Sequence, residues 1–174
     1  MPLLFGHALA GATIYVAGEK NALKPEERRG LIAACVLGAL PDIDLIFPWI
    51  LGLGIQWHGG FTHSILFACA SGVLAAWLLG VRSRRVVLLL MGAALTHGLL
   101  DAAMKRTYSG AALLWPFSSK VYKLGLIDYF AFYPDSRLDP PAVLVVRALE
   151  ISLYELLIFG SIVAVVVMIR RWLR

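Results

Sequence analysis

The sequence predicts an all-α, polytopic membrane protein with about five transmembrane helices, and three observations lead to this fold class. The 174-residue chain is 60% hydrophobic and 16% charged, whereas soluble domains average roughly half apolar and a quarter charged. Several apolar runs reach the ~18 residues that can cross a hydrocarbon core. Lysines and arginines collect in the short polar segments between these runs and at the C-terminus. Because unpaired backbone is not tolerated in lipid, one helical domain over residues 1–174 is expected.

The first three predicted spans are apolar segments that cover residues 3–18, 30–54 and 62–80. The first span is short and ends at the polar stretch EKNALKPEERRG. The second is interrupted by Pro41, which lacks an amide hydrogen and is expected to break the helix beside Asp42 and Asp44. The third follows His58 and His63 and ends before the basic stretch VRSRR. Polar or helix-breaking residues therefore mark the limits of each span.

The last two predicted spans cover residues 86–104 and about 142–169, and a long loop, residues 105–141, joins them. Within the fourth span, His97 and Asp101 are one helical turn apart and share a face. The loop interleaves tryptophan, tyrosine and phenylalanine with lysine. This composition suits the headgroup layer, where the loop would form an aromatic belt; a lid over a cavity is the alternative.

The distribution of positive charge orients the predicted spans. Basic residues crowd the segment after the first span, the turn between the third and fourth spans, and the C-terminus, whereas the connection between the second and third spans has none. The positive-inside rule therefore puts the N-terminus outside and the C-terminus inside, with five crossings. Because the net charge of +5 comes from such short segments, the basic residues are expected to orient the chain in the membrane and to contact anionic headgroups. No nucleic-acid partner is expected.

Four histidines and three aspartates are expected at similar depth in the outer half of the membrane. Four separate spans supply them: His7, Asp42, Asp44, His58, His63, His97 and Asp101. An intramembrane carboxylate costs about 2.5–3.5 kcal/mol at mid-helix on insertion scales and usually has a function. A divalent metal would offset this cost, and imidazole with carboxylate suits zinc or, alternatively, manganese. The clustering therefore predicts a metal site.

Each of these residues also has a purely structural interpretation. His7 could be a hydrogen-bonded packing residue, and the PDID stretch could be a turn with a capping aspartate. His58 could be an interfacial residue beside Trp57, and His97 could simply bond Asp101 within one helix. Their convergence at one depth favours the metal site over these separate interpretations.

The number of candidate ligands limits what the site can hold. Seven groups exceed the need of one zinc, so we expect either two neighbouring metals or one metal with an acid–base pair. The predicted metal ligands are His7, Asp42, Asp44, His63, His97 and Asp101. The predicted catalytic residues are Asp44 and His58, the latter as a general acid or as the partner of a ligand. A metal with an open position lowers the pKa of bound water toward ~7, which would supply a nucleophile for hydrolysis.

Five short motifs carry a resemblance to a known family. In chain order they are HALAG from His7, PDID from Pro41, HGGFTHS from His58, THGLLD from Thr96 and LWPFS from Leu114. Over residues 1–120 they resemble the membrane-bound metal-dependent hydrolases of the YdjM-like group, also described as LexA-binding, inner-membrane-associated hydrolases. The resemblance implies an inner-membrane location and metal-dependent hydrolysis. The family often has arginine where this chain has Gly59, so a substrate contact made by that arginine would be vacant here or filled by another cation.

The expected depth of the site suggests a membrane lipid as its substrate. A cavity at the outer boundary of the bilayer admits a lipid headgroup while the acyl chains stay in hydrocarbon. Two metals can stabilise the attacking and leaving oxygens of a phosphoester or pyrophosphate. Hydrolysis of an amide or ester bond is the alternative. Lys105 and Arg106 could contact a phosphate or could simply anchor the interface.

Two other functions compete with lipid hydrolysis. Buried histidines and carboxylates also build the pathways of proton- or cation-coupled transporters, but here they stop at one depth and no repeated halves appear. A non-enzymatic membrane regulatory protein would be expected to have a sizeable inner domain, yet the predicted inner loops are short. The sequence therefore favours the hydrolase.

Overall fold

The computed structural model describes residues 4–105, 110–127 and 141–173. Its α-helices are α1 (Leu4–Gly18), α2 (Arg28–Ala39), α3 (Ile46–Trp49), α4 (Ile65–Leu78), α5 (Arg84–Ala103) and α6 (Pro141–Trp172). Its short 3-10 helices are η1 (Pro25–Glu27), η2 (Leu40–Leu45), η3 (Ile55–Trp57) and η4 (Phe61–His63). Apart from two isolated β-bridges, these residues contain no β-strand. The predicted all-α class is confirmed.

Three helical stretches are long and apolar enough to cross a membrane: Pro25–Pro48, Arg84–Ala103 and Val145–Trp172. A fourth candidate combines Ile55–His63 with Ile65–Leu78, two stretches that meet at a bend of 60°. Helix α1 is apolar but has only 15 residues, fewer than the ~17–25 that a span usually needs. The described residues thus contain three or four candidate spans, and the five crossings and their orientation stay predictions.

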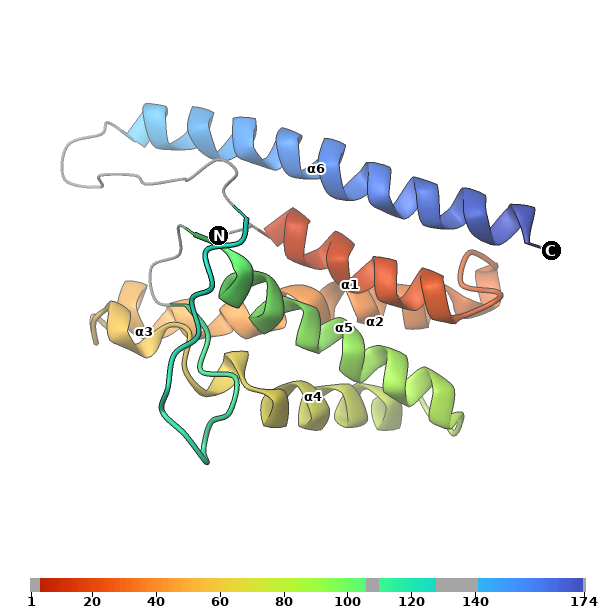
Figure 1. The fold of residues 1–174 in the computed structure, drawn as a ribbon, viewed down its shortest axis with the longest axis horizontal. Coiled ribbons are helices and arrows are strands. Elements are labelled where there is room, and N and C mark those ends of the chain that lie inside the picture. Colours follow the sequence, from red (N-terminus) through yellow and green to blue (C-terminus); the bar gives the residue numbers. More distant parts are fainter. Residues whose placement is uncertain (1–3, 106–109, 128–140, 174) are drawn as a thin grey trace.

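Helix α1 contacts three of the other long helices. It packs against α2, α5 and α6, while α4 packs against α5 (Figure 1). Fully buried side chains such as Tyr15, Ala34 and Ala93 fill these contacts. Large apolar residues cover the outside of the bundle, as at Trp77 and Met168, which are 73% and 68% exposed. Such an apolar surface suits acyl chains better than water.

Glycine lets the backbones of α1 and α2 approach each other closely. A Cβ atom on Gly38 would lie 2.3 Å from the His7 carbonyl oxygen, and one on Gly11 would lie 2.3 Å from the Ala34 carbonyl oxygen. Real Cβ atoms essentially never approach other atoms to less than 3.0 Å. Both glycines are therefore needed for this helix crossing, which brings His7 beside the end of α2.

The predicted helix break at Pro41 is confirmed. Helix α2 ends at Ala39, and the chain continues as the 3-10 helix η2, with Pro41 at its start. The change from α to 3-10 geometry alters the direction in which successive side chains point. Asp42 and Asp44 consequently lie at the end of the bundle, with Asp44 buried and Asp42 partly exposed.

The two ends of the bundle differ in chemistry. Helix α1 begins at one end, and α2 and α5 finish there, so the histidines and aspartates lie at this end (Figure 1). The opposite end holds the turn after α1, the start of α5 and the end of α6. Its basic residues include Lys20, Lys24, Arg28, Arg29, Arg84, Arg85, Arg170 and Arg171. The basic segments are thus separated from the histidine–aspartate cluster along the length of the bundle.

Residues 110–127, the described part of the long loop, pack against the segment that carries His58. The Ala112 amide donates to the Gly59 carbonyl oxygen at 2.9 Å, and the Ile65 amide donates to the Leu113 carbonyl oxygen at 3.0 Å. These bonds hold residues 110–127 at the cluster end of the bundle. Arg106, a predicted phosphate contact or interfacial anchor, lies outside the described residues. The aromatic stretch 129–133, part of the predicted aromatic belt or lid, lies outside them too.

Candidate metal centre

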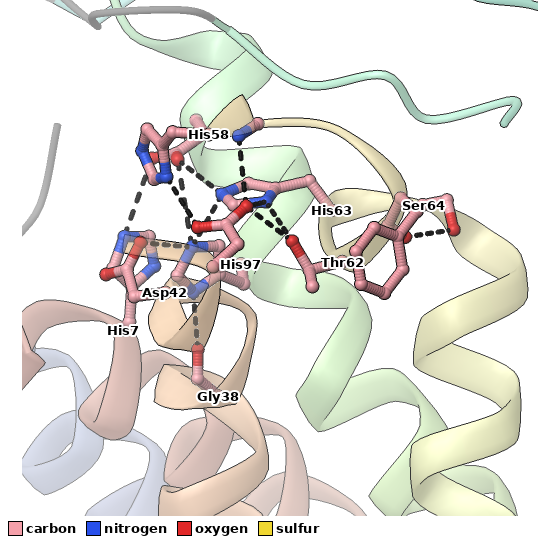
Figure 2. A network of polar contacts seen from close by, with 12 residues as sticks. His7, Gly38, Asp42, His58, Thr62, His63, Ser64 and His97 are labelled. Carbon is pink, nitrogen blue, oxygen red and sulfur yellow. Dashed lines mark hydrogen bonds and ion pairs between the residues drawn. The ribbon is translucent and has the colours of Figure 1, made fainter. Parts of the chain in front are cut away.

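The seven side chains that the sequence singles out lie in one buried cluster at the end of the bundle (Figure 2). Helix α1, η2, the η3–η4 segment and α5 supply, in chain order, His7, Asp42, Asp44, His58, His63, His97 and Asp101. Six of these residues are at most 2% exposed, and the side chain of Asp42 is 15% exposed. The cluster is therefore largely shielded from solvent, and Asp42 is its most exposed member.

One set of possible metal ligands includes Asp101 and three other residues. Asp101, Asp42, His58 and His63 each offer one ligand atom, and these atoms all lie within 4.8 Å of one another. His63 Nε2 is 3.3 Å from Asp101 Oδ2. Such spacing fits ligands that share one ion at ~2 Å each.

A second set of possible ligands consists of His7, Asp42 and His97, again with one ligand atom from each within 4.8 Å. His97 Nε2 is 3.3 Å from Asp42 Oδ1. The rings of His7 and His97 stack, with their centroids 3.6 Å apart. Because Asp42 belongs to both sets, its carboxylate would be a ligand for an ion bound in either one.

Four buried atoms of the cluster make no hydrogen bond among the described residues: His7 Nδ1, His7 Nε2, Asp42 Oδ1 and Asp101 Oδ1. Three of them have only long ion-pair contacts, His7 Nε2 with Asp101 Oδ1 at 3.5 Å and Asp42 Oδ1 with His97 Nε2 at 3.3 Å. A buried polar atom that is left unpaired costs about 1–3 kcal/mol, so native structures rarely keep several together. Carboxylate oxygens and neutral imidazole nitrogens are ligands for zinc and manganese. The residues present therefore fit the divalent metal that the sequence predicts.

Two histidines have their Nδ1 atoms held by groups outside the ligand sets. His97 Nδ1 donates to the Gly38 carbonyl oxygen at 2.8 Å. His58 Nδ1 lies 2.7 Å from Asp44 Oδ1. A partner at Nδ1 fixes the orientation of the ring and leaves Nε2 for a metal or a proton.

Asp44 supports the histidines and belongs to neither ligand set. Its Oδ2 accepts hydrogen bonds from the Gly59 amide at 3.1 Å and from the Thr62 hydroxyl at 2.6 Å. The same oxygen lies 3.4 Å from His63 Nδ1. Both carboxylate oxygens are engaged, which fits a positioning role for Asp44, and its role as a ligand stays a prediction.

Asp44→Asn is expected to weaken zinc binding by about 10–100-fold while the protein stays folded. The amide keeps the shape of the side chain but has one acceptor oxygen, so either His58 or the Gly59–Thr62 pair loses its acceptor. Competition with a chelator measures the zinc affinity of the purified protein. Ser64→Ala is the matched control, because the Ser64 hydroxyl caps α4 and faces away from the cluster (Figure 2). Equal zinc affinities of Asp44→Asn and the parent would contradict the positioning role.

Two residues that support the cluster were not among the predicted site residues. Glu155 of α6 is fully buried, and its Oε2 accepts from the Gly6 amide at 2.9 Å, next to His7 in the chain. The sequence held a signal for Glu155, because a carboxylate within an apolar span is expensive and needs a partner. Thr62, which donates to Asp44, had no signal beyond its place between two histidines of one motif.

Comparison with known proteins finds a family and a curated relative. The profile of the YdjM inner membrane protein family matches residues 1–173. A protein named inner membrane protein YbcI, from Escherichia coli (strain K12), is 32% identical over 127 residues, which cover 69% of this chain and 70% of that protein. No solved structure matches the chain. The family match includes all four parts of the chain that supply the cluster.

Proposed function

Because the chain belongs to the YdjM inner membrane protein family and is thus an inner membrane protein, we propose that it is a metal-dependent hydrolase embedded in that membrane. The proposed substrate is a phosphoester or pyrophosphate of a membrane lipid in the outer leaflet. Zinc is the favoured ion and manganese the alternative, with one or two ions bound.

The observation that carries this proposal is the pair of ligand sets that share Asp42, together with the buried polar atoms that make no hydrogen bond. With His58 left aside, each set has three protein ligands. They are His63, Asp101 and Asp42 in one set, and His7, His97 and Asp42 in the other. Three protein ligands with an open position are typical of catalytic zinc sites. A divalent ion held there would polarise phosphoryl oxygens and activate water.

His58 and Asp44 form the proposed acid–base pair. The contact of 2.7 Å between His58 Nδ1 and Asp44 Oδ1 lets the carboxylate orient the ring. A histidine held in this way can give a proton to the leaving oxygen, and such a transfer contributes about 10²–10⁴-fold to the rate. Both residues are at most 2% exposed, so bulk water has little access to the proton.

Exposed apolar residues beside the cluster support a lipid substrate. Ile50, Trp57 and Phe61 are 74%, 48% and 37% exposed, and the last two flank the His58 segment in sequence. Exposed side chains of this kind suit the boundary between acyl chains and headgroups. A headgroup at this level can approach Asp42 while its acyl chains stay in hydrocarbon.

Release of inorganic phosphate by the purified full-length protein tests the proposal. In detergent micelles that contain a lipid phosphomonoester or a lipid pyrophosphate, we expect release with zinc or manganese and none after chelation. His58→Gln is expected to keep its metal and to lose turnover by about 10²–10⁴-fold. Gln56→Ala, at an exposed polar position two residues away, is the control and is expected to keep the parent rate.

Two outcomes would contradict the hydrolase. One is metal-loaded protein that releases no phosphate from either class of lipid. The other is a His58→Gln variant that keeps the parent rate. In liposomes, a proton-driven cation flux without phosphate release would instead support a transporter.

A further inference from the structure

A cavity of about 160 Å³ lies at the basic end of the bundle, away from the candidate metal centre. It lies between the turn that follows α1 and the last turns of α6. Its lining includes Glu19, Lys20, Lys24, Arg170 and Arg171. A single water molecule needs only roughly 10–15 Å³ of such space, so the cavity has room for a phosphate group.

The charges that line this cavity are strongly unbalanced. Four cations face one carboxylate, which gives a net charge of +3 (four minus one). Glu19 is engaged in its own turn, because its Oε1 accepts from the Asn21 amide at 3.1 Å. None of the ion pairs found between described residues involves a cation of this cavity. Lys20, Lys24 and Arg171 therefore have no carboxylate partner in that part of the chain.

Arg170 holds the wall of the cavity in place. Its guanidinium donates to the Ala17 carbonyl oxygen near the end of α1. This bond joins α6 to α1, and it offsets the partial negative charge at the C-terminus of α1. The other three cations are left to act on a ligand in the cavity.

The apolar residues at this cavity are typical of a membrane surface. Leu23 and Val167 also line it, and Trp172 and Leu173 at the end of α6 are 85% and 68% exposed. Tryptophan at the end of a span is typical of the boundary between acyl chains and headgroups. A ligand here would meet cations and apolar side chains together, which matches a phospholipid better than a free ion.

We propose that this cavity binds the phosphate of an anionic phospholipid headgroup, with Lys20, Lys24 and Arg171 as its ionic contacts. Basic pockets between transmembrane helices are suited to such headgroups, because each lysine or arginine near an anionic surface adds to the binding free energy. The bound lipid would link the turn after α1 to the end of α6. This site is independent of the proposed hydrolase.

Thermal unfolding of the full-length protein in neutral detergent tests the lipid site. We expect soluble short-chain phosphatidylglycerol to raise the Tm in a saturable way, and phosphatidylcholine to leave it unchanged. In the double variant Lys24→Gln/Arg171→Gln, the half-saturating concentration of phosphatidylglycerol is expected to rise roughly tenfold or more. Each variant is compared with its own lipid-free Tm, so a change in basal stability does not obscure the result.

The matched control is Arg82→Gln/Arg84→Gln, which removes two exposed charges at the same end of the bundle but outside the cavity. This variant is expected to bind phosphatidylglycerol like the parent. An equal loss in both double variants would overturn the proposal, because it would indicate a diffuse attraction between charges. A full Tm increase with inorganic phosphate alone would also overturn it, since the site would then bind a free ion.

Discussion

Asp42→Ala is expected to remove nearly all tightly bound divalent metal from the protein, because the Asp42 carboxylate belongs to both ligand sets. Loss of a partner outside the ligand shell already weakens metal binding by about 10–100-fold. Loss of a ligand common to both sets is therefore expected to weaken metal binding by more than about 100-fold. The Asp42 side chain is 15% exposed, so its removal leaves no large buried cavity. The variant should fold and fail to hold metal.

Variants in a single ligand set separate one bound ion from two. His7→Ala changes only the second set, and His63→Ala changes only the first. If two ions bind, each variant is expected to keep one of them. If one ion binds, one of these variants is expected to lose all metal and the other to keep it.

Elemental analysis of the purified protein measures these metal contents. Glu26→Ala is the control, because Glu26 is an exposed carboxylate at the opposite end of the bundle. A second readout is the increase of the Tm on addition of zinc, which should vanish in Asp42→Ala, since a ligand stabilises only the state that binds it. Metal content and Tm response equal to those of the parent would end the case for a metal centre.

Gly38→Ala is expected to destabilise the protein by about 3 kcal/mol, at the upper end of the range for overpacked sites. In an exposed helix interior, alanine is normally preferred to glycine by up to ~1 kcal/mol. At Gly38 the added Cβ would lie 2.3 Å from the His7 carbonyl oxygen, and a backbone atom cannot rotate away. Helix α1 must then move away from α2 and carry His7 with it. Metal content is consequently expected to fall together with stability.

Unfolding in detergent, followed by circular dichroism, measures this loss of stability. Gly160→Ala in α6 is the matched control, because no atom lies within 4 Å of the Cβ it would add. That variant is expected to be neutral or slightly more stable than the parent. Similar stability changes in Gly38→Ala and Gly160→Ala would show that the close crossing of α1 and α2 is not what holds the cluster together.

Local rules account for much of the fold that the sequence predicts. The long apolar runs and the basic segments between them predict the order and approximate limits of the helices. Pro41 predicts the end of α2, because a residue without an amide hydrogen cannot continue the helical ladder. The spacing of His97 and Asp101 places both on one face of α5, and His97 Nε2 lies 3.7 Å from Asp101 Oδ2.

The separate roles of the clustered residues were harder to predict from the sequence. The two oxygens of Asp44 contact His58, Gly59 and Thr62, and the sequence did not predict the contacts with Gly59 and Thr62. Glu155 lies far away in the chain from Gly6, so no local pattern could pair them. The role of each side chain depends on which groups contact its polar atoms in the folded protein. The periodicity of the sequence does not specify those contacts.

Composition and local pattern alone thus account for an all-helical membrane protein and for a shared depth of its histidines and aspartates. Only packing decided that Asp42 lies between two ligand sets, since that position requires α1 to cross α2 at Gly11 and Gly38. Helix α5 likewise approaches the third motif where a Cβ on Gly98 would lie 2.4 Å from the His63 carbonyl oxygen. The physical reason is that apolar periodicity says which faces are buried. The absence of a side chain at a few glycines decides how closely those faces meet.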